Sequence, residues 1–401
     1  MSTAHVPPVP ERPGVLFPEL ARAEDNFRTC IQCGVCSASC PMGGVMDFPP
    51  RKAVRMLLEG RFDDVVASNT PWLCVSCHTC AVRCPSQLQI SDGLFPALRA
   101  ALIASGKPLD QDLQKALQNA YLYGNPMAGS PSKRADWART SGVPVPTLSQ
   151  LHRPVDVLWI VECYPSFQPR GQHISRLLAR ILYLLKVDFA ILGREERCIG
   201  DCEWMAGEHG LFEMLIERNI EIFGKYRFNK ILITDPHAYR TLQNIYPLLG
   251  GKYVVRHYVE FLTEHLPELK PLLKKPLNTA VTYHDSCCLG RKTGHYDEPR
   301  ELLRAIPGVK LTEMIQNRES SLCCGGGGST IYLDRFIQER AKDRLADRRI
   351  LQAAATGAEI LAVACPFEPS RFEDAVKITG NEAKLTVQDI IELLAESMEL
   401  V

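Results

Sequence analysis

The sequence lacks a long uncharged apolar run, and it lacks an excess of charge of either sign. Its most apolar stretch, residues 174–192, is interrupted by four charged residues, which favours a strand or a buried helix over a bilayer span. Lysine plus arginine and aspartate plus glutamate are balanced at 46 each, so no nucleic-acid partner is expected. The first residues contain several prolines and no apolar core, which argues against a signal peptide and predicts a disordered arm over residues 1–24.

Cysteine, in contrast, is abundant. The chain has 401 residues, enough for two or three domains, and sixteen of them are cysteines. In a chain that is not a small secreted scaffold, this usage indicates thiolates that bind metal in a reducing compartment rather than disulfides. We therefore expect a cytoplasmic protein with no transmembrane segment of its own, whose contact with a membrane would be peripheral and through a partner.

Eight of the cysteines form two copies of the spacing C-x2-C-x2-C-x3-C, each followed by proline. This spacing supplies the ligands of two [4Fe-4S] cubanes, and the fourth cysteine of each run serves the other cluster. The predicted sets are Cys30, Cys33, Cys36 and Cys84, and Cys74, Cys77, Cys80 and Cys40. Zinc is the alternative, because it also uses C-x2-C pairs, but it explains neither the third cysteine at the next x2 step nor the closing Cys-Pro. The chain is therefore expected to carry electrons.

The organisation of the chain changes near residue 125. Residues 25–123 hold both cysteine runs and show helical spacing over 51–60, and the helical pattern continues over 94–123. They are predicted as a helical domain with two clusters. Residues 124–150 are rich in Pro, Gly and Ser and are predicted as a linker.

Beyond the linker the sequence contains an internal repeat. In each half an apolar strand pattern leads to a first loop, a second loop follows 35 or 36 residues later, and another strand leads to a third. The loops carry Cys163, Cys198 and Asp235 in residues 151–275, and Cys287, Cys323-Cys324 and Cys365 in residues 276–401. Both halves are predicted as α/β units whose parallel strands present ligands at their C-terminal ends. The fold class expected is α+β, a helical ferredoxin-like domain followed by a duplicated α/β unit.

The two halves differ in chemistry. The second half has four thiolates on three loops, enough for a third cluster, and the divergent side chains of Cys323 and Cys324 suit a cluster more open than a cube. The glycines at 325–328 could turn N–H groups toward sulfide or a substrate anion, or form a simple flexible turn. Cys288 is interpreted as a buried neighbour rather than a reactive thiol.

The first half has lost ligands, because Ile199 and Asp235 stand at two positions where the second half has cysteine. The remaining candidate metal ligands are Cys163 and Cys198, which Cys202 and His237 could complement. We favour the alternative that this half is structural.

Polar residues beside the cysteines suggest further roles. His284 is the candidate catalytic residue, as a proton shuttle or a hydrogen-bond donor to sulfur, although a packed histidine is the alternative. Arg291 and Lys292 could offset cluster charge or bind a partner, or form an exposed basic turn. His78 could tune a cluster potential by hydrogen bonding, or face solvent.

The motifs resemble those of heterodisulfide reductases. Residues 25–105 resemble their iron-sulfur C-type subunit, through Cys30-Ile-Gln-Cys-Gly-Val-Cys36 and Trp72-Leu-Cys-Val-Ser-Cys-His-Thr-Cys80. Residues 155–390 resemble the catalytic B-type subunit, whose two cysteine-rich CCG repeats each read C...CCG...CxxC, and fusion of both parts is the arrangement of the D-type subunit. The family also includes electron-transfer subunits of sulfite reduction, glycolate and glycerol-3-phosphate oxidation, benzoyl-CoA reduction and flavoprotein-linked quinone reduction.

The resemblance implies that an intact CCG repeat binds a non-cubane [4Fe-4S] cluster through five cysteines. The second repeat matches at four of them and has Glu368 at the fifth, either as a carboxylate ligand or beside an open iron site. In the first repeat Asp-Pro-His-Ala, from Asp235 to Ala238, stands where the family has Cys-Pro-x-Cys. The resemblance therefore favours one third cluster, of the non-cubane type, in the second repeat.

These observations favour an electron-transfer subunit of a larger redox complex. Two cubanes would pass single electrons between a flavin or another cluster on a partner subunit and the cluster of the second repeat. The alternative is a catalytic subunit that reduces a disulfide at that cluster, with His284 supplying a proton, and a cavity reaching the Cys323-Cys324 loop would favour it. A third interpretation is a zinc or scaffold protein without redox activity.

Overall fold

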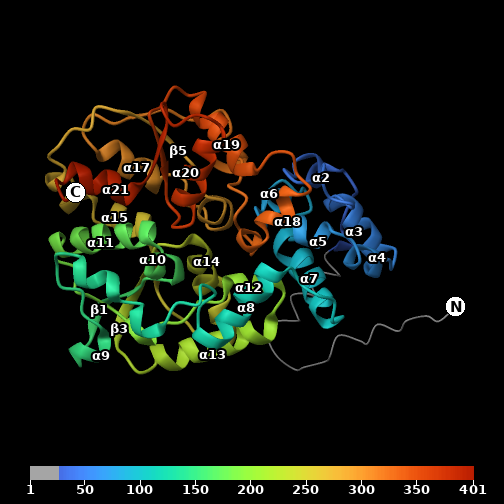
Figure 1. The fold of residues 1–401 in the computed structure, drawn as a ribbon, viewed down its shortest axis with the longest axis horizontal. Helices are drawn as coiled ribbons and strands as arrows, with labels where there is room; N and C mark the ends of the chain where they lie inside the picture. Colours follow the sequence, from blue (N-terminus) through green and yellow to red (C-terminus); the bar gives the residue numbers. More distant parts are fainter. Residues whose placement is uncertain (1–26) are drawn as a thin grey trace.

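The computed structural model describes residues 27–401, so the arm predicted over residues 1–24 lies outside the described residues. Figure 1 shows a helical N-terminal part at one end of the molecule and two α/β units beside it, one above the other. This is the α+β organisation that the sequence predicts. Within residues 27–401, every helix is too short or too polar to cross a bilayer.

Short helices surround the two cysteine runs in the N-terminal part. They are α2 (Val35–Ala38), α3 (Pro50–Leu58), α4 (Phe62–Val66), α5 (Thr70–Leu73), α6 (Thr79–Val82), η1 (Ile90–Leu94), α7 (Phe95–Ala104) and α8 (Gln111–Tyr123). The continuous helix expected over residues 94–123 is interrupted, because Gly106 adopts a φ of 68° and Pro108 follows it. Asp110 begins α8 by accepting a hydrogen bond from the Asp112 backbone N–H.

The first α/β unit contains a parallel sheet of four strands in the order β2-β1-β3-β4. The strands are β1 (Val155–Ile160), β2 (Phe189–Ile191), β3 (Phe228–Ile233) and β4 (Val255–His257). The helices are α10 (Cys163–Phe167), α11 (Pro169–Leu184), η4 (Gly193–Glu195), α12 (Asp201–Ala206), α13 (His209–Phe223), α14 (Pro236–Asn244), η5 (Tyr246–Leu249), α15 (Tyr258–Glu264), α16 (Leu266–Leu269) and η6 (Lys270–Leu272). Val157 and Trp159 of β1 enter one hydrophobic core and Leu158 and Ile160 another, so both faces of the sheet are covered.

The second α/β unit repeats this order as β6-β5-β7-β8, again with parallel strands. The strands are β5 (Ala280–Tyr283), β6 (Lys310–Leu311), β7 (Ile360–Val363) and β8 (Thr386–Asp389). The helices are η7 (Cys288–Lys292), α17 (Glu298–Ala305), η8 (Arg318–Ser320), η9 (Thr330–Tyr332), α18 (Asp334–Gln338), α19 (Leu345–Ala354), α20 (Glu368–Ile378) and α21 (Ile390–Ser397). The equal strand order confirms the duplicated α/β unit.

The segment predicted as a linker, residues 124–150, is packed onto the first unit. It forms η2 (Pro131–Lys133), η3 (Asp136–Thr140) and α9 (Leu148–Leu151). The Trp137 ring is buried with its centroid 5.3 Å from that of Trp159 in β1. Pro and Gly in this segment prevent long helices, but they do not prevent a large aromatic side chain from joining the core.

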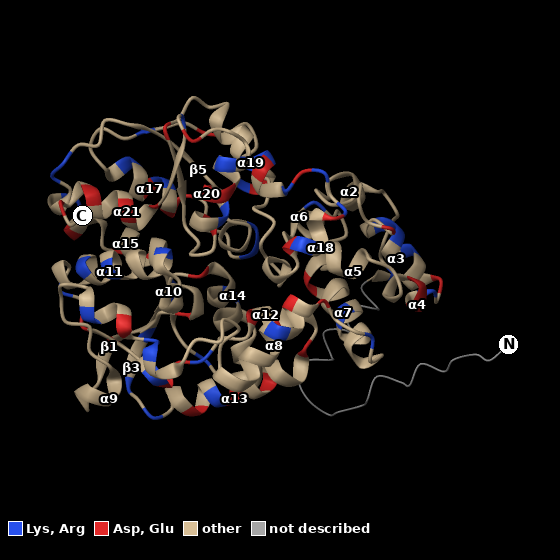
Figure 2. Ribbon diagram, viewed as in Figure 1, with Lys and Arg blue, Asp and Glu red and all other residues tan. Residues whose placement is uncertain are grey.

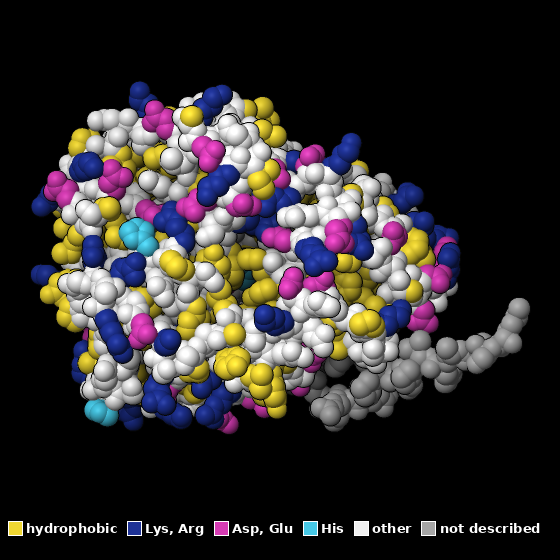
Figure 3. Space-filling view, viewed as in Figure 1, with side chains coloured by type: hydrophobic (Ala, Val, Ile, Leu, Met, Phe, Trp, Pro, Cys, Tyr) yellow, Lys and Arg dark blue, Asp and Glu magenta, His cyan; other side chains and the backbone are white. Residues whose placement is uncertain are grey.

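The two units meet through helices, with α11 against α21 and α15 against α17 (Figure 1). Arg170 of α11 pairs with Glu373 and Glu392 of the second unit, and the Tyr258 hydroxyl donates to Asp389 Oδ1 at 2.9 Å. Basic and acidic residues are distributed over both units and the N-terminal part (Figure 2). On the face drawn in Figure 3 their side chains are interspersed, and hydrophobic side chains gather where the three parts meet.

Candidate iron-sulfur centres

The two cysteine runs form loops of the same backbone shape. In the first, Gln32 and Gly34 have φ angles of 56° and 86°, and in the second the matching Ser76 and His78 have 51° and 64°. Two left-handed residues in each loop curl the backbone around its cysteines, and a short helix follows, α2 or α6. The second loop keeps this shape although it has His78 in place of a glycine.

Each predicted ligand set lines one small cavity. One cavity is bordered by Cys30, Cys33, Cys36 and Cys84, together with Pro85. The other is bordered by Cys40, Cys74, Cys77 and Cys80, together with Met42 and Phe95. The fourth cysteine of each run therefore lies with the first three of the other run. All sixteen cysteines are in the described part of the chain, and none forms a disulfide.

The chemistry of the second set fits a bound metal cluster. Burial raises the pKa of Cys40 and Cys80, and it raises that of Cys74 to about 11. Apolar surroundings and neighbouring thiols both oppose the thiolate form of each cysteine. Iron offsets this cost, because a coordinated thiol is deprotonated by the charge of the metal.

The cysteines of the second unit converge beyond the C-terminal ends of its strands, where all of them are buried. The Cys323 thiol donates to Cys287 Sγ at 3.9 Å, and the Gly325 backbone N–H donates to Cys323 Sγ at 3.2 Å. The hydrogen bond with Cys323 lowers the pKa of Cys324 to about 6 against the opposite effect of burial. Hydrogen bonding within the site therefore favours the thiolate form of Cys324, whereas burial raises the pKa of Cys365.

His284 and Glu368 lie next to Cys324 and are both buried. His284 Nδ1 accepts a hydrogen bond from Arg349 Nε at 3.0 Å, so the ring proton belongs on Nε2, which lies 3.3 Å from Glu368 Oε1. Burial lowers the pKa of His284 and raises that of Glu368. Among the described residues, Glu368 Oε2 has no hydrogen-bond partner. A buried carboxylate oxygen without a partner is the kind of group that a metal ion satisfies.

The glycines that follow Cys324 allow a close approach to the second cysteine run. A Cβ atom on Gly328 would lie 2.2 Å from Ser76 Oγ, and one on Gly327 would lie 3.2 Å from the Val75 carbonyl oxygen. Gly328 also has a φ of 62°. The glycines are therefore required by packing between the second unit and the N-terminal part, which differs from the flexible turn considered for them.

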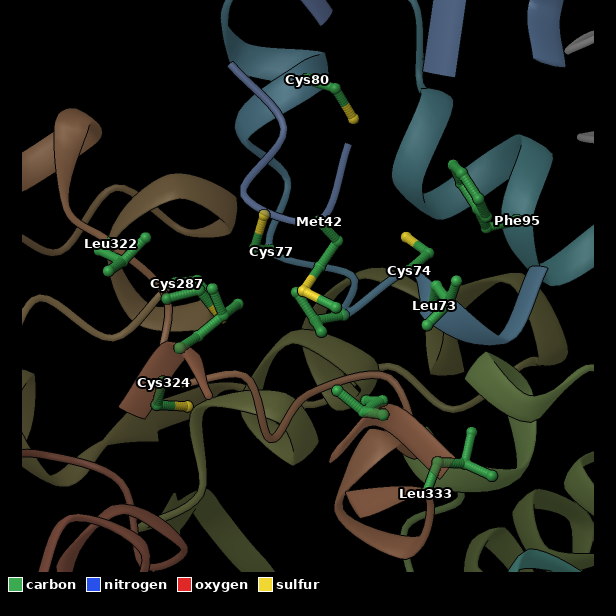
Figure 4. Packing of buried hydrophobic residues seen from close by; sticks show 14 of the residues in the cluster. Met42, Leu73, Cys74, Cys77, Cys80, Phe95, Cys287, Leu322, Cys324 and Leu333 are labelled. Carbon is green, nitrogen blue, oxygen red and sulfur yellow. The ribbon is translucent and has the colours of Figure 1, made fainter. Parts of the chain in front are cut away.

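The two sites share one hydrophobic core. In Figure 4, Cys77 and Cys287 lie on the two sides of the junction, with Met42 and Leu322 beside them, and all four belong to the same buried cluster. Arg291, which follows Cys287 in the second unit, donates from Nε to the Cys77 carbonyl oxygen at 2.7 Å. The junction therefore holds the two sets of thiols next to each other.

A buried charged cluster joins all three parts of the molecule. Asp92 of η1 pairs with Lys292 of the second unit and Arg240 of the first, each at 3.0 Å. These cations hold the pKa of Asp92 well below its usual range, although burial opposes them. His78 Nδ1 lies 3.0 Å from Ser91 Oγ and is mostly buried. The exposed basic turn considered for Arg291 and Lys292 is therefore incorrect, since both side chains are buried at the junction.

Arg99 of α7 reinforces the same junction. Its wholly buried guanidinium donates to the Met205 carbonyl oxygen at 2.6 Å and to the Gly328 carbonyl oxygen at 2.8 Å. It also donates to the carbonyl oxygens of Pro71 and Cys74 in its own part. One side chain therefore fixes the second cysteine run against both α/β units.

In the first unit, a buried ion pair lies beside Cys163 at the end of β1. Arg134 pairs with Glu196 at 2.7 Å, and both side chains are 2% exposed. The Glu196 carboxylate accepts hydrogen bonds from the backbone N–H groups of Val161 and Glu162, at the end of β1. Arg134 also donates to Cys163 Sγ at 3.4 Å. Nothing in the sequence marks Arg134 or Glu196, which are 62 residues apart and carry no motif.

The three cysteines of the first unit border a cavity between the two α/β units. Cys198 donates to Glu203 Oε2 at 3.5 Å, while Ile199, at the position of Cys324, is buried in the core. The cavity is lined by Cys163, Cys198, Cys202, Asp235, His237 and the glycine loop of the second unit. It therefore reaches the loop that follows Cys323 and Cys324.

Known protein families match the parts that this geometry defines. The model of a 4Fe-4S dicluster domain matches residues 26–88, and that of the cysteine-rich domain CCG matches residues 157–243 and 281–367. A curated D-type subunit of the dihydromethanophenazine:CoB–CoM heterodisulfide reductase from Methanosarcina mazei is 31% identical over 88% of this chain and 82% of the relative. The chain belongs to the family of these D-type heterodisulfide reductase subunits.

Other relatives of this family member are longer. The probable iron-sulfur-binding oxidoreductase FadF of Bacillus subtilis is 34% identical over 84% of this chain and 47% of the relative. The EtfAB:quinone oxidoreductase of Syntrophomonas wolfei is 34% identical over 84% of this chain and 48% of the relative. The chain thus spans about half the length of these two relatives. Within the family, this chain has the iron-sulfur dicluster domain and both CCG repeats.

Proposed function

We propose that this chain is the electron-transfer subunit of a larger oxidoreductase complex. Two [4Fe-4S] cubanes would be held by the two ligand sets that line the N-terminal cavities. A third iron-sulfur cluster, of the non-cubane type, would be held by Cys287, Cys323, Cys324 and Cys365. Single electrons would pass between this third site and a flavin-containing or iron-sulfur partner subunit through the two cubanes.

The observation that carries this proposal is the packing of the two cysteine sites at the junction. Arg291 donates to the carbonyl of Cys77, and the glycine loop after Cys324 touches Val75 and Ser76. Adjacent centres exchange electrons without large movements, and a buried, rigid junction keeps their separation fixed. The names of the relatives FadF and EtfAB:quinone oxidoreductase support a redox role.

The proposed entry point for electrons is the first set, whose cavity is bordered by Cys30, Cys33, Cys36 and Cys84. Cys33 is exposed and Ile31 beside it is 68% exposed, whereas Cys74, Cys77 and Cys80 are buried. A redox partner can therefore approach the first set more closely than the second set, of which only Cys40 is partly exposed. The proposed electron path therefore runs from the partner to the cluster of the first set, which includes Cys33, and then to the cluster of the second set at the junction.

Two residues complete the proposed third site. Glu368 Oε2 would be the fifth ligand, a harder oxygen donor in place of a thiolate. The Nε2 proton of His284 faces Glu368 and Cys324 and would donate a hydrogen bond to one of them. If the third site reduces a substrate, His284 is the candidate proton donor. Cys163 and Cys198 remain candidate ligands, but the Arg134–Glu196 pair supports a structural role for the first unit.

A second candidate function is the reduction of a disulfide at the third site. The cavity between the α/β units favours it, because a small substrate could approach the Cys323-Cys324 loop through it. The relatives named as subunits of heterodisulfide reductases support the same chemistry. In both candidates the chain is part of an oxidoreductase, and its cytoplasmic location stays a prediction.

Iron and sulfide content, with EPR during a reductive titration, tests the proposal on the anaerobically purified chain. We expect about twelve irons, four for each of three clusters. Cys324→Ala should lose one EPR signal and about four irons. The matched control is Cys288→Ala, a buried neighbour outside the proposed ligand set, which should keep both. About eight irons, with spectra that Cys324→Ala leaves unchanged, would mean that the α/β units bind no cluster and serve as a scaffold.

A further inference from the structure

His237 belongs to the first unit, but its ring lies at the candidate ligands of the second. It follows β3 at the position that Phe367 occupies after β7, and the two ring centroids are 6.1 Å apart. A ligand atom of His237, a carboxylate oxygen of Asp235 and Cys365 Sγ all lie within 4.8 Å of one another. A Cβ atom on Gly327, in the loop after Cys324, would be 3.4 Å from His237 Nε2. The ring therefore adjoins two of the three loops that carry thiols in the second unit.

The carboxylate of Asp235 fixes the ring. Its Oδ1 atom accepts from the His237 backbone N–H at 2.8 Å and lies 2.8 Å from His237 Nδ1. The two side chains are only 14% and 11% exposed. Metal-binding histidines are commonly held by a carboxylate on the other ring nitrogen, which fixes the tautomer and the ring orientation. With Nδ1 engaged, Nε2 is the nitrogen that remains for a metal.

The ligand count of the second unit leaves room for such a nitrogen. The unit supplies four candidate thiolates, and its glutamate, Glu368, groups with Cys324 and His284 rather than with His237 and Cys365, so the iron at Cys365 can take a further ligand. Two ligands on one tetrahedral ion lie roughly 3.5 Å apart when the metal–nitrogen and metal–sulfur lengths are about 2.0 and 2.3 Å. The grouping of His237 and Cys365 within 4.8 Å is compatible with this separation after a small adjustment.

We propose that His237 Nε2 coordinates the iron-sulfur cluster of the second unit, on the iron that Cys365 binds. The first unit, which has lost most of its own ligands, thus supplies one to its sister, and Asp235 orients it. The neutral imidazole adds no negative charge beside the Cys365 thiolate, and histidine ligation raises the potential of an iron-sulfur centre. The inference rests on the proposed function, because it requires the third cluster.

The experiment is electron–nuclear double resonance on the reduced, anaerobically purified chain, produced with 15N-labelled histidine. We expect one strongly coupled nitrogen on the EPR signal that Cys324→Ala removes. His237→Gln should abolish this coupling and keep the signal, and His237→Cys should keep the iron and lower the midpoint potential. The matched control, His295→Gln, alters a histidine bonded to Tyr239 and Glu298 and should leave the coupling intact.

Three results would overturn the proposal, and they separate it from the proposed function. If the third EPR signal is present without strong nitrogen coupling, His237 is no ligand while the third cluster stands. If His284→Gln rather than His237→Gln removes the coupling, the nitrogen belongs to the second unit itself. If the native chain has only about eight irons and no third signal, four per remaining cluster, both proposals fail.

Discussion

The two α/β units share a strand order, yet they solve the same local problem with different chemistry. At the end of β1, the Glu196 carboxylate binds two backbone N–H groups and a buried arginine. At the end of β5, Asp285 binds Arg300 with both carboxylate oxygens, and Cys287 follows two residues later. Both loops are fixed by a buried ion pair, but only the second unit still collects four thiols.

The comparison teaches that the fold of such a repeat does not depend on its metal ligands. The sheet of the first unit is covered on both faces by apolar side chains, and Ile199, at the position of Cys324 in the second unit, belongs to that core. Burial of apolar surface contributes most of the stability, while ligand loops only extend from the strand ends. A repeat with fewer cysteines at these loops can therefore keep the same fold and pack against the other repeat.

The largest expected difference between the units is in iron binding. Cys287→Ser should remove the third cluster and lower the iron content from about twelve to about eight per chain, at four irons per cluster. Cys163→Ser, the same change in the first unit, should leave it near twelve. Colorimetric iron assays with EPR check both variants. Equal losses would mean that the first unit also binds a cluster.

A second prediction concerns the buried pairs. Glu196→Gln leaves Arg134 as an uncompensated buried charge and should destabilise the chain by about 3 kcal/mol without loss of iron. Asp285→Asn should cost less, because Arg300 keeps its pair with Glu313 at 2.6 Å, but it should also reduce the iron content, because its loop carries Cys287. Urea midpoints followed by tryptophan fluorescence under anaerobic conditions give the first quantity. If Glu196→Gln releases iron, the first unit is more than structural.

A third prediction concerns Arg99, which attaches the N-terminal part to both α/β units. Arg99→Met removes the hydrogen bonds to Met205 and Gly328 and leaves buried carbonyl groups without donors. We expect a loss of about 2 kcal/mol in the free energy of unfolding, measured by urea denaturation. The control is Arg335→Met, whose side chain is 83% exposed and which should have almost no effect. A loss as small as that of the control would contradict a role of Arg99 in holding the three parts together.

The smallest expected effect is at the interface between the units. Burial raises the pKa of Asp389 to about 7, and the hydrogen bond from the Tyr258 hydroxyl opposes this. A carboxyl pKa raised on folding costs stability as the pH rises from about 4 through 7, because the charged form is favoured in the unfolded chain. Tyr258→Phe should therefore cost about 1 kcal/mol, and more at pH 8 than at pH 6.

The control for that variant is Tyr183→Phe, since Tyr183 is 52% exposed. Thermal midpoints at both pH values measure the difference. A cost that does not grow with pH would mean that Asp389 is not ionised over this interval.

Sequence reasoning was most successful where a pattern lies within a short stretch of chain. The strand runs at β1, β3, β5 and β7 are predicted from their apolar residues alone, because a buried parallel strand needs them. The helical pattern over residues 94–123 was less reliable, since Gly106 and Pro108 interrupt it. The linker composition of residues 124–150 did not reveal that Trp137 is buried, because burial depends on what lies opposite.

The spacing of the cysteines and the internal repeat can both be read from the sequence. Spacing fixes which cysteines can curl around one cavity, and the matching loops at Cys163 and Cys287 fix the repeat. Only the tertiary structure decided where the remaining polar groups act. Lys292 meets Asp92, and His237 meets Cys365, across more than a hundred residues of chain. Such contacts depend on how the three parts pack, which no local pattern encodes, because each partner is chosen by the shape and charge of a distant surface.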